Sequence, residues 1–244
     1  MSFYAEFAEH YEAIFPFSDA VYALLRRYIL PEHRRCLDVG CGTGHYCGRL
    51  AADGFDAVGI DLDAAMIAHA RQRYPQATFH VLNMVDSAAL VSTGITEGEE
   101  RFDVAFCIGN TAAHLTQAQF AQFLDSMQRV LVPRASWILQ VMNWDYVVKR
   151  ESFTFPVIEA PGGLTFHREY RAISSAKVAF HTRLQSGSMV IFEDQVPLYP
   201  LLAADIARLH EERGFTYVAH FGSYDGAPFD PETFSANIFV FRSA

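Results

Sequence analysis

A glycine-rich segment followed by an isolated acid is the part of this sequence best suited to bind a ligand. Residues 36–44 read CLDVGCGTG, and Asp61 closes a second apolar segment about twenty residues further on. Glycines at such a turn let the backbone pass close to a ligand because they carry no Cβ. An acid at this spacing can accept hydrogen bonds from the hydroxyls of a ribose. The pattern therefore predicts a nucleoside cofactor.

The register of the glycines and the charge before them narrow the cofactor class. A dinucleotide-binding turn has the form Gly-x-Gly-x-x-Gly, whereas here Gly40, Gly42 and Gly44 alternate and His45 takes the place of the last glycine. Asp38 lies just before the turn, where its charge would repel a pyrophosphate and attract an amino group. Both features disfavour an NAD-dependent dehydrogenase and favour a ligand with an ammonium group.

The string LDVGCGTG at residues 37–44 resembles the first motif of the class I methyltransferases that use S-adenosylmethionine (SAM). The resemblance implies SAM as the cofactor and S-adenosylhomocysteine (SAH) as the product. A tight strand-to-helix turn that binds nothing is the alternative interpretation. On the basis of the resemblance, the expected cofactor-binding residues are Tyr11, Asp38, Gly40, Cys41, Gly42, Gly44, Asp61, Leu62, Met66, Asn83, Met84 and Cys107.

Adenine recognition is expected after the third strand. Related methyltransferases have an aspartate where this chain has Asn83, whose amide oxygen can still accept a hydrogen bond from the adenine amino group, and Met84 offers its backbone N–H. Met66 could pack on the adenine or belong to the core. Asp61 could instead begin a helix, a role that Asp63 could equally fill.

The segment CIGNTAAHL at residues 107–115 resembles the Gly-Asn-Ser-x-x-His-Leu segment of glycine, sarcosine and some aminosugar N-methyltransferases. The resemblance implies that Asn110 faces the acceptor amine and that His114 lies near it. A histidine has a reference pKa of about 6.5, which suits a general base. The structural alternatives are a left-handed turn residue for Asn110 and a helix-start residue for His114.

The segment NWDY at residues 143–146 resembles the Arg-Asn-Tyr-Asp-Tyr segment of glycine N-methyltransferases, with Met142 in place of the arginine that holds the substrate carboxylate. Arg168 or Arg171, on opposite faces of a predicted strand, could substitute, or both could be solvated. Tyr11 and Phe15 match aromatic residues that cover the methionine moiety, or they pack on the sheet. The expected substrate-binding residues are Phe15, Asn110, Asn143, Tyr146, Arg168 and Tyr170.

Composition and net charge indicate which broad classes of protein this chain can belong to. The chain has 244 residues, 51% of them hydrophobic and 19% charged, which indicates an ordinary soluble globular protein. A formal net charge of −9 disfavours a nucleic-acid partner. We see no signal peptide and no apolar run long enough to cross a membrane, so we expect a cytoplasmic protein. The cysteines form no Cys-x-x-Cys pair and the histidines no metal spacing, so we expect no metal.

The apolar pattern predicts alternating strands and helices between residues 36 and 142. Expected strands lie at 36–40, 57–60, 78–82, 104–108 and 136–142, and expected helices near 43–52, 63–74 and 117–130. Such alternation indicates an α/β fold with a Rossmann-like, doubly wound, mostly parallel sheet, of seven strands once two C-terminal strands near 215–222 and 236–242 are added. A helix near 201–213 precedes those last strands.

Two further segments lie outside that alternation. Residues 3–30 have helical spacing with a break at 15–17, where Ser18 or Asp19 could begin the second helix. Residues 153–198 show period-two runs and turn signals, which predict an antiparallel β insert. We therefore expect N-terminal helices and the cofactor core at 1–150, an acceptor lid rich in aromatic residues at 151–198, and the last helix and strands of the core at 199–244.

The sequence supports a SAM-dependent methyltransferase that transfers a methyl group to an amine of a small molecule by in-line displacement. A small-molecule O-methyltransferase and a non-catalytic SAM-binding regulatory protein stay open as alternatives. The lid could also form a homodimer contact, which no sequence feature decides.

Overall fold

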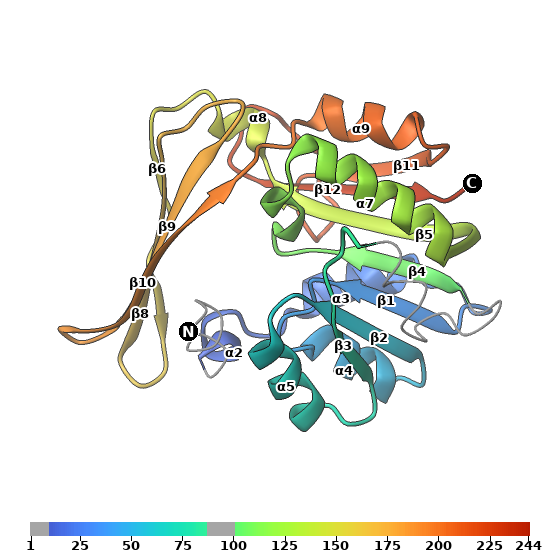
Figure 1. Cartoon of the computed structure of the whole chain (residues 1–244), viewed down its shortest axis with the longest axis horizontal. Coiled ribbons are helices and arrows are strands. Elements are labelled where there is room, and N and C mark those ends of the chain that lie inside the picture. The colour runs from blue at the N-terminus through green and yellow to red at the C-terminus, as the bar shows by residue number, and fades with distance from the viewer. Residues whose placement is uncertain (1–9, 87–100) are drawn as a thin grey trace.

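The computed structural model describes residues 10–86 and 101–244. Figure 1 shows a twisted sheet flanked by helices, with a second, antiparallel sheet standing to one side. The predicted fold class, a Rossmann-like α/β fold with an antiparallel insert, is confirmed. Within these two ranges, no helix is long and apolar enough to cross a membrane.

The larger sheet has the strand order β11-β12-β5-β4-β1-β2-β3. Its first five strands in the chain are parallel to one another, whereas β12 runs antiparallel to both β5 and β11. The order reverses between β1 and β4, and ligands of such sheets bind at that point, beyond the carboxyl ends of the strands. The strands are β1 (Arg35–Val39), β2 (Asp56–Asp61), β3 (Thr78–Val81), β4 (Phe102–Cys107), β5 (Leu131–Met142), β11 (Thr216–Phe221) and β12 (Ala236–Arg242).

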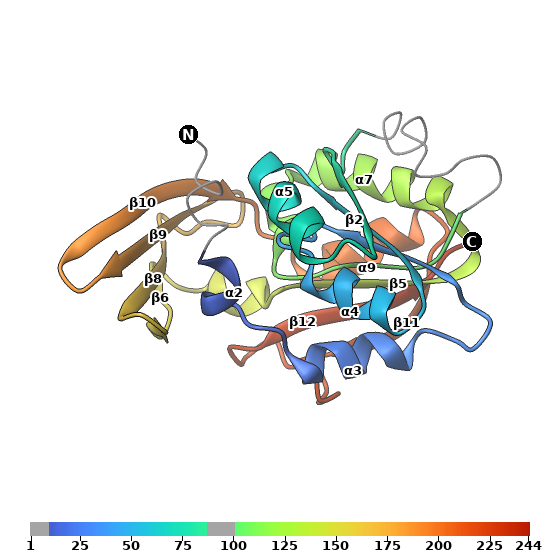
Figure 2. The same cartoon turned by 90° about the horizontal axis from the view of Figure 1, so that it is seen from below.

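Helices cover both faces of this sheet, and each face has its own buried cluster. On one face lie α3 (Asp19–Arg27), α4 (His45–Ala52) and α5 (Ala64–Arg73). On the other face lie α7 (Gln117–Val130) and α9 (Ala203–Glu211). Figure 2 shows α3 and α7 on opposite sides of the strands. The central strands are buried on both faces, which explains why their sequences are continuous apolar runs, whereas the edge strands β3 and β11 are more exposed.

Polar side chains cap the N-termini of α3 and α7. Each capping residue lies just before an apolar segment with helical spacing. The Ser18 side chain accepts a hydrogen bond from the backbone N–H of Val21, so Ser18 and not Asp19 caps α3. Thr116 and Gln119 form a reciprocal capping box at the start of α7. Such caps satisfy backbone N–H groups that have no partner inside the helix.

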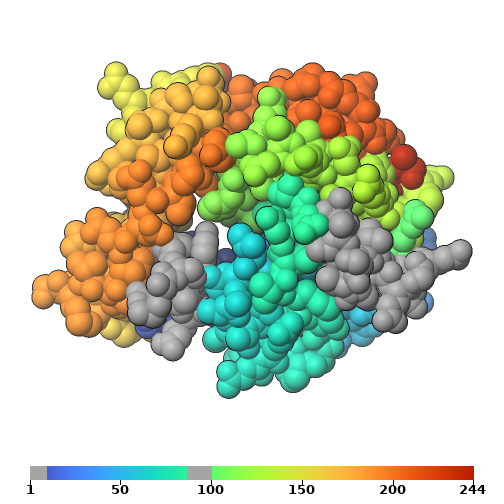
Figure 3. All heavy atoms as spheres, in the orientation of Figure 1, coloured from blue at the N-terminus to red at the C-terminus, as the bar shows by residue number. Residues whose placement is uncertain are grey.

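The insert is an antiparallel sheet with the strand order β10-β9-β8-β6, and β7 pairs with β8. One face of β8 is buried, because Leu164, Phe166 and Tyr170 alternate with more exposed residues. In the space-filling view the insert, in yellow and orange, forms a lobe beside the body that contains the larger sheet (Figure 3). Its strands are β6 (Phe153–Thr154), β7 (Ile158–Ala160), β8 (Leu164–Arg171), β9 (Val178–Ser186) and β10 (Met189–Leu198).

The two ends of the insert meet at the core. The chain leaves β5, forms the short helix α8 (Trp144–Val147), passes through the insert and returns at the start of α9. There the Asp145 carboxylate accepts a hydrogen bond of 2.9 Å from the backbone N–H of Ala203. This contact joins the segment before the insert to the segment after it.

The structure departs from the predicted elements in three places. Strand β5 begins at Leu131, five residues before its predicted start, and the four-residue helices α8 and η1 (Thr111–His114) were not predicted. At the N-terminus, the expected first helix is present as α2 (Tyr11–Ile14). The part of that prediction that falls on residues 1–9 lies outside the described residues.

Candidate functional site

A pocket of about 440 Å³ lies where the larger sheet meets the insert. Its wall is built from the ends of β1, β2, β4 and β5, from α2, and from the inner face of β8, β9 and β10. The position coincides with the reversal of strand order, the usual ligand site in this kind of sheet. The volume lies in the lower part of the range of roughly 300–1,000 Å³ typical of small-molecule sites.

The three glycines of the turn serve different purposes. Each has a left-handed backbone, with φ of +74° at Gly40, +55° at Gly42 and +79° at Gly44. A Cβ on Gly40 would lie 2.4 Å from Cγ2 of Thr111, and one on Gly44 would lie 2.5 Å from the ring of Phe79. Packing inside the protein therefore demands glycine at these two positions. Gly40 and Gly42 still border the pocket, whereas Gly44 does not, so its expected place beside the cofactor stays a prediction.

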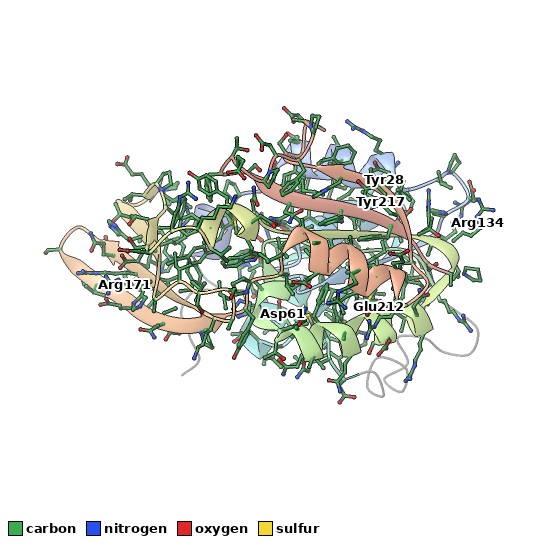
Figure 4. The ribbon with its side chains drawn as sticks, turned by 90° about the horizontal axis from the view of Figure 1, so that it is seen from above. Tyr28, Asp61, Arg134, Arg171, Glu212 and Tyr217 are labelled. Carbon is green, nitrogen blue, oxygen red and sulfur yellow. The ribbon has the colours of Figure 1, made fainter. Side chains whose placement is uncertain are left out.

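Asp61 lies at the end of β2 and borders the pocket. Its carboxylate accepts hydrogen bonds of 2.9 Å from the backbone N–H groups of Gly42 and Asp63. Asp63, not Asp61, caps α5 by accepting from Ala65 and Met66. Burial raises the pKa of Asp61, and the backbone hydrogen bonds oppose that rise. Figure 4 shows Asp61 in the central part of the molecule.

Asp38 lies behind the pocket wall and is buried. Burial and then the negative charge of Asp61 raise its pKa well above the usual range, while a hydrogen bond from the Cys47 thiol opposes the rise. The buried carboxyl group of Asp38 and the neighbouring, half-buried one of Asp61 make this end of the pocket favourable for a positively charged ligand. Asp38 does not border the pocket, and its predicted place near the ammonium group of the cofactor stays a prediction.

The two cysteines expected near the cofactor have side chains that lie away from the pocket wall. Cys107 is fully buried in the core, and Cys41 packs its sulfur against Gly59, so neither side chain borders the pocket. Burial and the nearby carboxylates raise the pKa of both thiols. Both are therefore protonated at neutral pH and are poor nucleophiles.

Apolar side chains continue the wall beyond Asp61. Leu62 borders the pocket and is 69% exposed. Met66 and Met84 also border the pocket. Asn83 does not, because its side-chain oxygen accepts a hydrogen bond of 3.1 Å from the backbone N–H of Val85 and shapes the turn after β3.

Asn110 occupies a left-handed position, with φ of +65°, in the loop after β4. Its side-chain oxygen accepts from the backbone N–H of Met142 at 2.9 Å. Its amide nitrogen lies 3.5 Å from the hydroxyl of Tyr170. The oxygen of Gln140 holds the same loop by accepting from the N–H of Gly109 at 2.7 Å. The Asn110 side chain therefore presents its NH₂ group, a donor, to the pocket.

His114 and Tyr170 border the same cavity. Burial lowers the pKa of His114 below its usual value, so its imidazole is neutral near pH 7 and can accept a proton. Burial raises the pKa of Tyr170, whose ring stacks on Trp144 with a centroid distance of 5.2 Å. Tyr170 is therefore a protonated phenol held in a fixed orientation.

Aromatic rings form the insert side of the pocket. Phe155, Phe166 and Phe180 from the insert and Phe15 from the end of α2 border it, and Tyr11 borders it next to Gly42. The guanidinium group of Arg168 lies among these rings. Arg171 lies on the other face of β8, is exposed and pairs with Glu169. Figure 4 shows Arg171 far out on the insert.

Asn143 and Tyr146 lie outside the pocket wall, and their expected role in substrate binding stays a prediction. Asn143 is buried, and its side-chain oxygen accepts from the N–H of Tyr146 at the start of α8. Its amide nitrogen donates to the carbonyl oxygens of Asp230 and Thr233 at 2.9 and 2.8 Å. The Tyr146 ring packs against Phe234. Both residues hold the base of the insert.

Several wall residues were not predicted from the sequence: Gly109, Thr111, Gln140, Thr182 and Leu198. Gln140 could have been recognised from the sequence, because it is the polar residue in the apolar run 137–141. The structure shows that it is buried in β5. A buried polar side chain in a central strand needs a partner. The loop N–H groups of Gly109 and Asn110 supply that partner.

Comparison with known proteins gives a family match over about two fifths of the chain. Residues 36–134 match the family model described as a methyltransferase domain. A dTDP-3-amino-3,6-dideoxy-alpha-D-glucopyranose N,N-dimethyltransferase from Streptomyces fradiae is 34% identical over 142 residues, 57% of this chain and 47% of that protein. A glycine/sarcosine N-methyltransferase from Parasynechococcus marenigrum is 26% identical over 80% of this chain and 68% of that protein.

The chain spans about half the length of the first of these relatives, and solved structures match its fold over almost its whole length. A SAM-dependent methyltransferase from Clostridium acetobutylicum has a TM-score of 0.78 at 11% identity and covers 100% of both chains. A SAM-bound amino pentose methyltransferase from Micromonospora echinaspora has a TM-score of 0.70 at 20% identity and covers 97% of this chain and 96% of that one. The resemblance inferred from residues 37–44 is confirmed.

Proposed function

From the methyltransferase domain that this chain carries at residues 36–134, and from the pocket beside it, we propose that the protein transfers a methyl group from SAM to an amine of a small molecule. One observation carries the proposal. A single cavity joins Gly42 and Asp61 to Asn110, His114 and Tyr170, so groups suited to a nucleoside and groups suited to a reacting amine face the same space.

The residues present fit SAM. The Asp61 carboxylate keeps acceptor capacity for ribose hydroxyls beyond its bonds to Gly42 and Asp63. Leu62, Met66 and Met84 offer an apolar surface for adenine. Asp38 and Asp61 favour the ammonium and sulfonium groups, because a bound cation lowers the raised pKa of each carboxyl group and stabilises its charged form. When bound, SAM supplies a methyl group already activated on its sulfonium.

The protein's own task is to place the acceptor and to handle its proton. Placing the acceptor in line with the reacting group can lower the activation free energy by on the order of 7–11 kcal/mol. In this proposal the Asn110 NH₂ group and the Tyr170 hydroxyl orient the acceptor, and neutral His114 takes the proton from its ammonium form. The amine lone pair is then free to attack. The aromatic insert covers the cavity and keeps water away from it.

We propose that the chain is divided as the sequence suggests. Residues 1–150 and 199–244 form the cofactor side, and residues 151–198 form the roof over the acceptor. The two relatives support an amine as the acceptor, since their names describe N-methylation of an aminosugar nucleotide and of glycine or sarcosine. Asn110 and His114 support catalysis over mere binding, because a protein that only binds SAM needs no second set of polar groups beside it.

Thermal unfolding with SAM, SAH, NAD or no ligand tests the cofactor. A ligand at one hundred times its dissociation constant stabilises the native state by about 2.7 kcal/mol. We expect a rise in the unfolding temperature with SAM and SAH and none with NAD. No shift with SAM or SAH would overturn the proposal.

A second measurement tests transfer. Purified protein and SAM are incubated with a panel of primary amines and with matched alcohols, and SAH is quantified. We expect SAH with at least one amine. SAH with alcohols alone would show O-methylation, and binding of SAM without SAH from any acceptor would show a binding protein; either result contradicts N-methylation.

A further inference from the structure

Arg168 is placed in the cavity in a way that its own contacts do not explain. It lies on the pocket face of β8 with Phe166 and Tyr170, two residues away on either side. The centre of its guanidinium lies 4.8 Å from the Phe155 ring and 5.8 Å from the rings of Phe15 and Phe166. The charge is therefore enclosed by aromatic faces on one side of a ligand pocket.

The surroundings leave this cation without a counter-charge. Among the described residues, Arg168 forms no ion pair, and its guanidinium donates one hydrogen bond, of 3.3 Å, to the carbonyl of Pro156. Its Nε is buried and has no hydrogen-bond partner in the described part of the chain. Burial lowers its pKa, as expected for a cation that is partly removed from water.

Nearby carboxylates are engaged elsewhere. Glu169 lies on the opposite face of β8 and pairs with Arg171. Asp194 shares the face of Arg168 but lies two strands away, beyond Thr182, and its carboxylate accepts from the N–H of Gln195 at 2.7 Å. Removing a guanidinium partly from water without a counter-ion costs free energy, and a bound anion offsets that cost.

From this placement we infer that Arg168 binds an anionic group of the methyl acceptor, so the substrate is a small amine that carries a carboxylate or a phosphate. The inference rests on the proposed function. A planar guanidinium suits both anions because it can donate two parallel hydrogen bonds to either. The position differs from the anchor expected from the glycine N-methyltransferase resemblance, where Met142 stands in this chain.

The geometry also sets the distance between amine and anion. Tyr170, whose hydroxyl lies next to the Asn110 amide, is two residues along β8 from Arg168 on the same face. Two residues of a strand span on the order of 7 Å. An acceptor whose amine is at Asn110 and whose anion is at Arg168 therefore has several bonds between them, more than glycine has. The pocket must hold this acceptor beside the cofactor, which limits it to a compact molecule.

The test compares anionic acceptors with neutral ones of the same shape. One pair is 4-aminobutyrate and 4-aminobutanamide, and the other is glucosamine 6-phosphate and glucosamine; the two pairs separate a carboxylate from a phosphate. Glycine tests the distance. The variants are Arg168→Met and Arg168→Lys, with Arg171→Met as the matched control on the other face of the same strand. SAH formation gives kcat and KM for each combination.

We expect the wild-type protein to prefer at least one anionic member by tenfold or more in kcat/KM. Arg168→Met should remove that preference through a higher KM and change the neutral member less than threefold. Arg168→Lys should restore part of it, and Arg171→Met should leave it intact. As a readout without turnover, the preferred anionic amine should raise the unfolding temperature of the SAH-bound wild type but not that of SAH-bound Arg168→Met.

Three results would overturn the inference. Equal use of anionic and neutral amines by the wild type would refute anion recognition while leaving the proposed function intact. Equal losses for both members in Arg168→Met would show that Arg168 only packs against the aromatic rings. Absence of SAM or SAH binding by the wild type would instead remove the proposed function, and the inference with it.

Discussion

The side-chain oxygen of Asn110 accepts a hydrogen bond of 2.9 Å from the backbone N–H of Met142. This bond ties the loop after β4 to the end of β5 and leaves only the NH₂ group of Asn110 to face the pocket. The left-handed backbone of Asn110 also makes it a turn residue. The structural and functional interpretations of Asn110 therefore hold together, because the same bond that shapes the loop orients the amide.

Substitutions at Asn110 should separate these roles. Asn110→Ala should lose about 2–3 kcal/mol of unfolding free energy, from left-handed strain and from the lost hydrogen bond. Asn110→Gly removes only the bond and should lose about 1 kcal/mol. Asn110→Asp keeps an acceptor for Met142 but removes the donor, so it should stay close to wild-type stability and still form SAH more slowly. Urea unfolding and SAH assays check this series, and full activity in Asn110→Asp would contradict the role of the NH₂ group.

Asp61 should control cofactor affinity. Asp61→Ala removes the acceptors for the ribose and for the N–H groups of Gly42 and Asp63, so we expect SAM affinity to fall by at least tenfold. Calorimetric titration with SAH measures the change. Asp56→Asn is the control, since Asp56 begins the same strand, is exposed and pairs with Arg35. Equal affinities in Asp61→Ala and Asp56→Asn would exclude the assigned role.

His114 should govern the acid side of the pH profile. Its pKa lies below 6.5, so the imidazole is neutral and active above that value and becomes protonated only as the pH falls further. With a weakly basic amine as acceptor, we expect kcat/KM to decline only below about pH 6.5. His114→Gln should lower kcat by roughly 10²–10⁴-fold and abolish this decline.

The control for His114 is His80→Gln. Burial also lowers the pKa of His80, but this residue lies in β3 and does not border the pocket. Its replacement should leave the decline in place. A profile of His114→Gln that matches the wild type would remove His114 from the mechanism.

His210 should make the fold sensitive to acid. Its Nε2 accepts from the Trp137 indole at 2.9 Å, so the proton is on Nδ1, which donates to the carbonyl of Ile206 at 2.6 Å. Burial lowers the pKa of His210 to about 3. The unfolded chain binds a proton below about pH 6.5 and the folded chain does not until about pH 3, so stability falls as the pH drops through this interval.

Urea unfolding at several pH values measures this effect. His210 alone should contribute a slope of up to about 1.4 kcal/mol per pH unit between pH 6.5 and 3. His210→Gln should be less stable at neutral pH and show a shallower slope. Parallel slopes for the two proteins would show that other groups cause the acid sensitivity.

The core elements were predictable because their burial leaves a simple pattern. Strands covered by helices on both faces are continuous apolar runs, and the insert alternates because one of its faces is more exposed. Helix α8 could not be found in this way, since four residues show no periodicity. The early start of β5 was hidden by Pro133 and by Arg134, whose left-handed φ of +64° interrupts the regular strand.

Site residues were predictable where a sequence motif determines the backbone conformation. They were less predictable where the direction of a side chain determines whether the residue borders the pocket. The string at residues 37–44 located the turn and Asp61, yet the clash of a Cβ at Gly44 with Phe79 depends on a strand far along the chain. Resemblance placed Asn143 near the substrate, but its amide nitrogen donates to carbonyl oxygens of a loop at residues 230–233 that no local pattern connects to it. Long-range contacts of this kind require coordinates.

The hydrogen bond between Asp145 and Ala203 closes the base of the insert. The roof of the pocket is thus one contiguous stretch of chain that leaves the core and rejoins it at neighbouring points. Besides these two junctions, the insert packs on Ile14 and Met66 of the core. Substitutions within residues 151–198 can therefore reshape one side of the pocket without altering the strands that carry Asp38 and Asp61.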